Sequence, residues 1–197
     1  MSTSQKISLV ILIIVVLVAA IIIAFYLFRR YQYKEMKLKV ENLLTTYIEK
    51  LSFQSNDEKM TIRKTKDYDF NFILEDDKAT IYVKLVPNFQ NYEILVNSRT
   101  KWQIIKSVYD DKIHLVEGIE LPMTKQFNNA DKLVKKLFII YPQARTLMHA
   151  LNECEYEFIY PHTSVYGCQI ILFKDLEYLI KNDRFELISN NEKIENK

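Results

Sequence analysis

The chain has 197 residues, with 27 basic and 25 acidic side chains, so its nearly balanced charge gives no reason to expect a nucleic acid as partner. Only Gly118 and Gly167 supply glycine, and neither GxxxxGKS/T nor GxGxxG occurs, which excludes a P-loop NTPase and a Rossmann dehydrogenase. The length suits one modest domain plus one extra element.

Residues 7–28 (ISLVILIIVVLVAAIIIAFYLF) carry no charged side chain and predict a transmembrane helix. These 22 residues, at a rise of ~1.5 Å each, span ~33 Å, enough to cross a hydrocarbon core of ~30 Å. A cleaved signal peptide is the alternative, but its apolar region is about 7–15 residues long. We therefore expect an uncleaved anchor in the lipid bilayer, preceded by a short segment at residues 1–6.

Basic residues gather on the far side of this span. Lys6 and the free amino group precede it, and the residues that follow it include Arg29, Arg30, Lys34, Lys37 and Lys39. The positive-inside rule then predicts an amino terminus outside the cell and a cytosolic location for the rest of the chain. Arg29, Arg30 and Lys34 are also placed to attract anionic lipid headgroups.

Residues 29–52 predict an amphipathic juxtamembrane helix, because apolar side chains recur at steps of three and four through residues 36–51. This stripe has two interpretations. It packs on the domain that follows, or it pairs with a protein partner or a second copy of the chain. The stripe covers only about two heptads, whereas a coiled coil is indicated by about three to four, so packing on the same chain is favoured.

Residues 53–185 predict one cytoplasmic α+β domain, and residues 186–197 a polar tail. Apolar and polar residues alternate in four successive segments, which is typical of strands with one buried face. These segments are residues 60–66, 68–74, 78–86 and 91–97. We expect them to form an antiparallel meander. Residues 99–126 fit either strands or a short helix with a loop.

From Asn128 onward the pattern predicts helices mixed with strands, in the order αβαββα. The expected elements are a helix at 128–137, a strand at 138–142, a helix at 143–153, strands at 156–161 and 168–173, and a helix at 174–182.

Zinc-binding residue types occur at His149, Cys154, His162 and Cys168. They are separated by four, seven and five residues, which matches no compact zinc knuckle. The favoured interpretation is structural. His149 is expected on a helix surface, His162 in a loop, and the cysteines as small apolar side chains.

The segment HTSVYG joins two predicted strands and contains His162 and Tyr166. Loops at strand ends often carry binding residues, so these two side chains are the candidate binding residues. Gly167 in the same loop allows a positive φ or close packing.

Asp69 and Lys84 lie on neighbouring predicted strands, where a hairpin can bring them to one face of the sheet. Divalent-metal nucleases use an acid on one strand and an acid-x-lysine on the next to hold Mg²⁺ and activate water. Tyr82 stands here in place of the second acid. Because one carboxylate is a poor magnesium site, an ordinary solvated sheet face is favoured.

The order of the predicted elements, with Asp69 and Lys84, nevertheless resembles the restriction-endonuclease-like, PD-(D/E)xK fold over residues 35–182. The closing CQIILFKDLEYLI is similar to the strand-plus-helix ending of nuclease-related domains. This resemblance implies cleavage of nucleic acid with magnesium as cofactor. Since Tyr82 replaces the second acid, it implies a degenerate copy, or one in which Glu93 serves as that acid.

The first functional interpretation is a single-pass membrane protein with a cytoplasmic domain that binds a partner or ligand without catalysis and without a cofactor. A membrane-tethered nuclease-like domain is the alternative, and a zinc-stabilised module is the second alternative.

Overall fold

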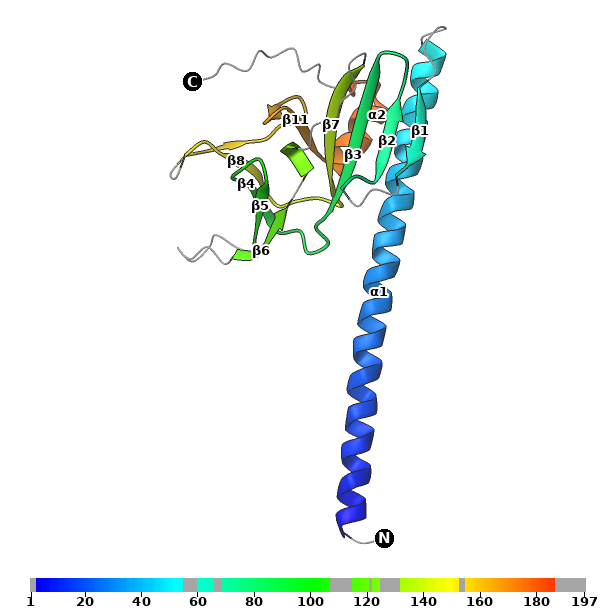
Figure 1. Cartoon of the computed structure of the whole chain (residues 1–197), viewed down its shortest axis with the longest axis vertical. Coiled ribbons are helices and arrows are strands. Elements are labelled where there is room, and N and C mark those ends of the chain that lie inside the picture. The colour runs from blue at the N-terminus through cyan, green and yellow to red at the C-terminus, as the bar shows by residue number, and fades with distance from the viewer. Residues whose placement is uncertain are drawn as a thin grey trace. The chain divides into compact units, whose positions relative to one another are not determined.

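The computed structural model describes residues 3–54, 60–65, 69–106, 115–120, 122–124, 132–152 and 155–186. The fold is α+β, as the sequence predicts, with a long amino-terminal helix followed by strands in two sheets and a short helix (Figure 1). The chain divides into two compact units, Met1–Lys39 and Val40–Lys197.

Helix α1 (Thr3–Gln54) runs without a break through the predicted membrane span and the predicted juxtamembrane helix. The large apolar side chains described between Ile7 and Phe28 are all exposed, each to between 51% and 68%. A helix that is apolar all round satisfies its own backbone and suits a hydrocarbon environment. By length and composition, α1 is able to cross a membrane.

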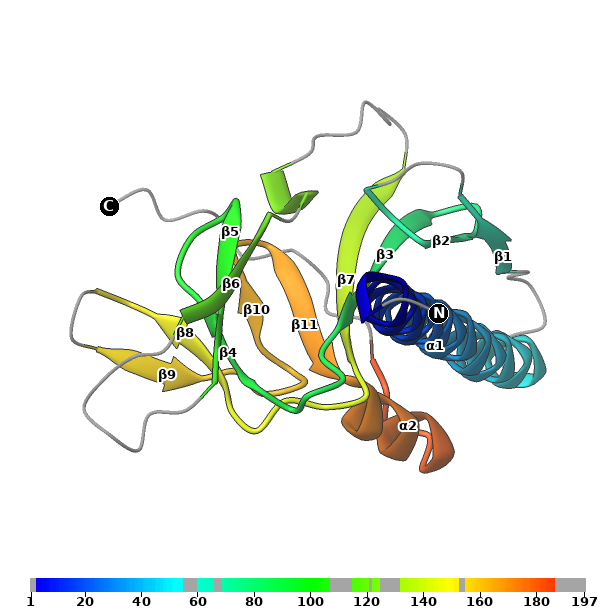
Figure 2. The same ribbon diagram turned by 90° about the horizontal axis from the view of Figure 1, so that it is seen from below.

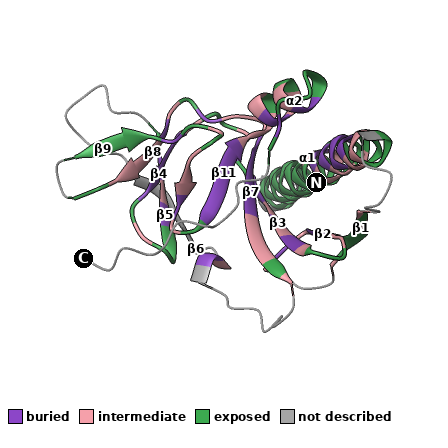
Figure 3. Cartoon of the chain, turned by 90° about the horizontal axis from the view of Figure 1, so that it is seen from above, coloured by how far each residue is buried: buried purple, intermediate pink, exposed green. Residues whose placement is uncertain are grey.

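The end of α1 belongs to the second unit and packs within it (Figure 3). Its buried side chains are Val40, Leu43, Leu44 and Tyr47. The Tyr47 ring meets the Phe185 ring edge-on at 5.1 Å between centroids. The Lys50 ammonium lies 2.7 Å from the Asp183 carboxylate. From Val40 onward, therefore, the apolar stripe packs on the domain that follows.

The first sheet has the strand order β1-β2-β3-β7-β11-β10. Its strands are β1 (Thr61–Lys64), β2 (Phe72–Glu75), β3 (Ala79–Pro87), β7 (Leu133–Tyr141), β11 (Cys168–Leu172) and β10 (Ser164–Val165). Strands β1 to β3 are antiparallel, whereas β7 runs parallel to both of its neighbours, β3 and β11. A central parallel strand is covered on both faces, and the four consecutive residues 137–140 of β7 are accordingly fully buried.

The second sheet has the order β6-β5-β4-β8-β9. Its strands are β6 (Leu115–Glu120), β5 (Lys101–Ile105), β4 (Glu93–Val96), β8 (Leu147–Ala150) and β9 (Tyr156–Phe158). Strands β4 and β8 are parallel and the other pairs are antiparallel (Figure 2). A one-turn helix, η1 (Pro122–Thr124), follows β6, and helix α2 (Phe173–Lys181) follows β11 directly.

Apolar side chains from both sheets share one core. The ring centroids of Trp102 in β5 and Phe138 in β7 are 5.5 Å apart. The indole N–H of Trp102 donates to the sulfur of Met123 at 3.0 Å. The same cluster contains Cys168, which is 1% exposed. The sheets are thus stabilised by mutual burial of apolar surface.

Two chain segments pass from the first sheet to the second side by side, because β3 leads into β4 and β7 leads into β8. Asn88, which is 2% exposed, links these two corners. Its side-chain nitrogen donates to the backbone oxygens of Tyr92 at 2.8 Å and Gln143 at 3.0 Å. Its side-chain oxygen accepts the N–H of Tyr92 at 3.1 Å. A buried amide with its partners satisfied holds the corners together.

Two helices expected in the second half are wrong. Residues 133–141 form β7 and residues 147–150 form β8, whereas the first part of the expected helix at 128–137 lies largely outside the described residues. The apolar residues of both segments are spaced by three and four, which fits a helix. Strand pairing overrides this local pattern because each segment has strand neighbours on both of its sides.

The expected four-stranded meander is wrong in its last strand. Residues 91–97 contain β4, which lies in the second sheet and pairs with β5 and β8. Pro87 ends β3, and the corner at Asn88 turns the chain away before β4 begins. Residues 101–105 and 115–120, which the sequence left open, form strands β5 and β6.

Candidate functional site

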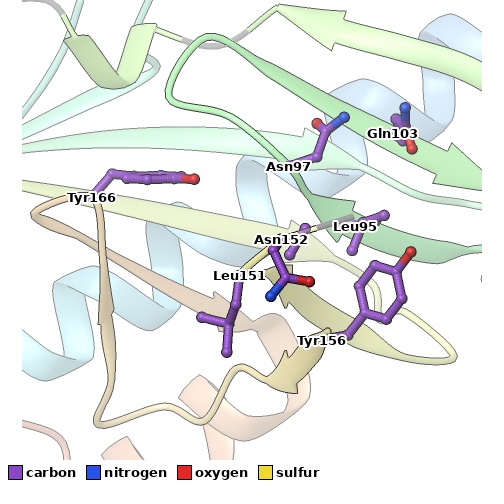
Figure 4. Close-up of a pocket in the computed structure, with 8 residues that line it drawn as sticks. Leu95, Asn97, Gln103, Leu151, Asn152, Tyr156 and Tyr166 are labelled. Atoms are coloured by element: carbon purple, nitrogen blue, oxygen red, sulfur yellow. The ribbon is translucent and has the colours of Figure 1, made fainter. Parts of the chain in front are cut away.

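An open pocket with a volume of about 410 Å³ lies where the parallel strands β4 and β8 end. Its apolar lining is Leu95, Ala150 and Leu151, its amides are Asn97, Gln103 and Asn152, and its aromatic rings are Tyr156 and Tyr166 (Figure 4). Small-molecule sites commonly enclose ~300–1,000 Å³, so the pocket is large enough for a ligand.

The topology explains why these residues meet. Parallel neighbours end at the same edge of a sheet, so Asn97 after β4 and Leu151 after β8 leave the sheet together. Strand β5 adds Gln103, which is directly opposite Leu95 in the antiparallel pair. The turn between β10 and β11 contributes Tyr166.

The three lining amides differ in their hydrogen bonds. Asn152 holds the turn between β8 and β9, because its side-chain nitrogen donates to the Glu155 carboxylate at 2.6 Å and its oxygen accepts the Glu155 N–H at 2.9 Å. Within the described residues, the side chains of Asn97 and Gln103 form no hydrogen bond. These two amides are therefore available to a ligand.

Tyr166 occupies an unusual backbone conformation. It follows Val165, which pairs with Cys168 across the turn between β10 and β11. The φ angles of Tyr166 and Gly167 are 52° and 73°, the combination that a two-residue hairpin favours. A non-glycine residue with such a φ costs about 1–2 kcal/mol. The positive φ of Gly167 confirms the expectation from the sequence.

The Tyr166 ring is held on two sides. The guanidinium carbon of Arg99 lies 5.5 Å from its centroid, and the His149 ring meets it edge-on, with centroids 5.0 Å apart. His149 is itself oriented, because its Nδ1 donates to the Glu157 carboxylate at 3.0 Å. Cation–π contacts contribute about 0.5–1 kcal/mol at exposed sites. The turn and these contacts fix Tyr166 before any ligand arrives.

The two candidate binding residues separate in space. Tyr166 lines the pocket, whereas His162 is exposed and stacks on the Tyr160 ring with centroids 5.9 Å apart. Sequence reasoning missed Asn97, Gln103 and Arg99, because no motif or periodicity distinguishes them from ordinary loop and strand residues.

The nuclease candidates are distributed over both sheets. Lys84 is half-buried in β3 of the first sheet, and Glu93 begins β4 of the second sheet. Glu93 is 6% exposed, and its carboxylate lies 3.9 Å from Nε of Arg145. Asp69 precedes β2 in a bend, so its expected position on that strand is wrong.

Asn71, in the same bend, forms a hydrogen bond to strand β3. Its side-chain oxygen accepts the N–H of Leu85 at 2.7 Å. Tyr82 packs on Phe70 with ring centroids 5.3 Å apart. Around the expected acid and lysine, the neighbouring side chains thus serve packing and strand pairing.

The zinc candidates also occupy different surroundings. His149 lies on strand β8, so its expected place on a helix is wrong, and Cys168 lies in the core between the sheets. Burial raises the pKa of the Cys168 thiol to about 11, although the nearby Lys136 ammonium opposes this shift. Cys154 lies outside the described residues. Among the described side chains, no group of three or more His, Cys, Asp or Glu could hold a metal ion.

Comparison of the chain with protein-family models, with curated proteins and with solved structures gives no match.

Proposed function

We propose that this chain is a single-pass membrane protein whose folded domain binds a small ligand in the pocket at the ends of β4 and β8, without converting it. The apolar surface of α1 between Ile7 and Phe28 carries the first part of this proposal. Exposed to water, so large an apolar surface would be strongly unfavourable, and a bilayer removes that cost.

The orientation is proposed from the basic residues of α1, which favour a cytosolic domain. Some of these side chains have intramolecular neighbours. The Arg29 guanidinium lies 5.2 Å from the Phe25 ring centroid, and the Lys39 ammonium lies 2.8 Å from the Glu35 carboxylate. Arg30 and Lys34 remain suited to anionic lipid headgroups, which would add an electrostatic contribution to anchoring.

The proposal of binding without catalysis rests on the pocket lining. General acid–base catalysis needs a titratable group within hydrogen-bond reach of the substrate, and nucleophilic catalysis needs an activated nucleophile. Among the described residues that line the pocket, the polar groups are amides and tyrosine hydroxyls. Such groups orient a ligand well but are poor proton-transfer catalysts at neutral pH.

The anchor is tested by alkaline carbonate extraction of membranes that contain the full chain. The parent should stay in the membrane pellet. A variant with Val15→Arg and Val18→Arg should move to the soluble fraction, because each central arginine costs about 2.5–3.5 kcal/mol of insertion free energy. Val15→Leu with Val18→Leu is the matched control and should behave as the parent. Extraction of the parent by carbonate would contradict the proposal.

The pocket is tested by ligand-observed NMR. A library of small compounds is screened against the full chain in phosphatidylcholine nanodiscs and against Ala150→Trp, whose indole would fill the pocket. We expect compounds that bind the parent and lose their signal with Ala150→Trp. Gln90→Trp, at an exposed loop position, controls for the added indole and should keep these signals. If no compound distinguishes the two variants, the pocket is not a binding site.

A further inference from the structure

The polar groups that face the pocket share one property. The amides of Asn97 and Gln103 and the hydroxyls of Tyr156 and Tyr166 are uncharged, and each side chain can both donate and accept hydrogen bonds. An ionised group of a ligand would find no opposite charge among the described lining residues, and the Arg99 guanidinium nearby is directed at the Tyr166 ring. The lining therefore selects an uncharged polar ligand.

The lining also offers apolar surface beside these groups. Leu151 is 55% exposed and Tyr156 is 47% exposed, so both present carbon atoms to an incoming ligand. A tyrosine combines an apolar ring with a polar tip. A pyranose ring has the matching pattern, since its C–H face is apolar and its edge carries hydroxyls that both donate and accept.

The arrangement of the rings argues against a flat nucleobase. A base is best held face to face on an aromatic ring. Arg99 already lies over the Tyr166 ring and His149 meets the edge of that ring. Figure 4 shows Tyr166 and Tyr156 at opposite ends of the pocket, so they do not form a slot for a planar group. The open mouth suits a ligand that keeps part of its hydration.

The geometry points to a neutral sugar ring, or a short neutral oligosaccharide, as the ligand of this pocket. Asn97 and Gln103 bind its hydroxyls, Tyr156 and Leu151 pack on its C–H face, and the Tyr166 hydroxyl completes the polar contacts. This inference rests on the proposed function, in which the pocket is a binding site. The sugar has two sources, a free saccharide or the headgroup of a neutral glycolipid.

The test uses the full chain in phosphatidylcholine nanodiscs, prepared with an amine-oxide detergent because sugar detergents would compete. Glucose, N-acetylglucosamine, maltose and lactose are the neutral probes for ligand-observed NMR. Glucuronic acid and adenosine are the charged and planar probes. The glycolipid source is tested by hydrogen exchange in nanodiscs with and without glucosyl diacylglycerol, which should protect amides at residues 95–97 and 150–152.

We expect at least one neutral saccharide, free or lipid-linked, to bind. Asn97→Leu and Gln103→Leu should each raise Kd at least tenfold, while Gln90→Leu, an exposed amide outside the pocket, should leave Kd unchanged. Tyr156→Ala should weaken binding because it removes the ring that packs on the C–H face, and Tyr178→Ala on α2, where the side chain is 59% exposed, is its matched control. Asn97 is exposed, so its variant keeps the test open even if Gln103→Leu folds poorly.

Three outcomes would overturn the assignment to sugars. Saccharide binding that survives both amide substitutions would place the sugar elsewhere. Binding of adenosine or glucuronic acid in preference to every neutral saccharide would give the pocket another ligand class. A failure of all the saccharides to bind would also overturn it, and the proposed function would then stand only if other compounds still bind the parent and are lost with Ala150→Trp.

Discussion

Replacing Cys168 by serine tests the core between the two sheets most directly. Cys168 is 1% exposed, and its sulfur lies 3.8 Å from the backbone oxygen of Tyr166 and 4.0 Å from that of Met123. A serine hydroxyl sits on a shorter bond and needs an acceptor within about 2.5–3.0 Å, so neither oxygen is close enough without movement. Burying this hydroxyl unpaired should cost about 1–3 kcal/mol of the free energy of unfolding.

The magnitude translates into a measurable shift. For a unit of this size, each kcal/mol changes Tm by about 2–4 °C, so Cys168→Ser should lower Tm by about 2–12 °C. Trp102 is the chain's single tryptophan and is fully buried in the same cluster, which makes its fluorescence the natural reporter. Urea and thermal melts of the full chain in phosphatidylcholine vesicles would follow it.

Two control variants isolate the buried hydroxyl. Cys168→Ala removes the sulfur without adding a polar group and should be milder than Cys168→Ser. His162→Ala removes an exposed ring and should change stability by no more than about 0.5 kcal/mol. The reasoning is refuted if serine is tolerated as well as alanine at residue 168. Equal large losses for Cys168→Ser and His162→Ala, with stoichiometric zinc in the parent, would instead support the zinc-stabilised module.

Three other predictions follow from the fold. Asn88→Ala should lower the free energy of unfolding by at least about 2 kcal/mol in a urea melt, because it removes three hydrogen bonds between a buried amide and the part-buried backbone of Tyr92 and Gln143; a near-neutral effect would show that the corner does not depend on this amide. The folded-state pKa of Cys168, about 11, lies above its ordinary value of 9.0. Its contribution to stability should therefore be complete below pH 9 and lost as pH rises towards 11, and Cys168→Ala should remove this part of the pH dependence. Protease added to intact cells should leave the second unit undigested, since we predict a cytosolic domain, and its digestion from outside would reverse the orientation.

The long apolar helix at the start of the chain was predictable because its signal is local. Residues 7–28 carry no charge and predict an apolar helix whatever the rest of the chain does, and α1 covers all of them. The strands with alternating polarity, such as β3, were predictable for the same reason. Strands β7 and β8 were not, because the apolar residues of both segments are spaced by three and four and fit one face of a helix equally well. Only pairing with β3 and β4, which are distant in sequence, decides between the two structures.

The pocket was beyond sequence reasoning for a related cause. Asn97, Gln103, Asn152 and Tyr166 come from four separate parts of the second unit and share no spacing. Tyr166 was identified only because it lies in a loop between strands. The position of its ring depends on contacts with Arg99 and His149, and nothing in the sequence indicates these contacts.

The corner at Asn88, where the chain leaves the first sheet, explains both the wrong prediction for β4 and the position of the pocket. Because β3 and β7 are parallel neighbours that turn together, β4 and β8 emerge as parallel neighbours in the second sheet. Parallel strands end at one edge, so their exits bring Asn97 and Leu151 to the same pocket. An antiparallel continuation of β3 into a fourth meander strand would have left Asn97 at an edge without β8. The amide of Asn88 joins the segment that leads into β4 to the segment that leads into β8. We therefore expect it to fix the relative position of these two strands, and with it the geometry of the pocket.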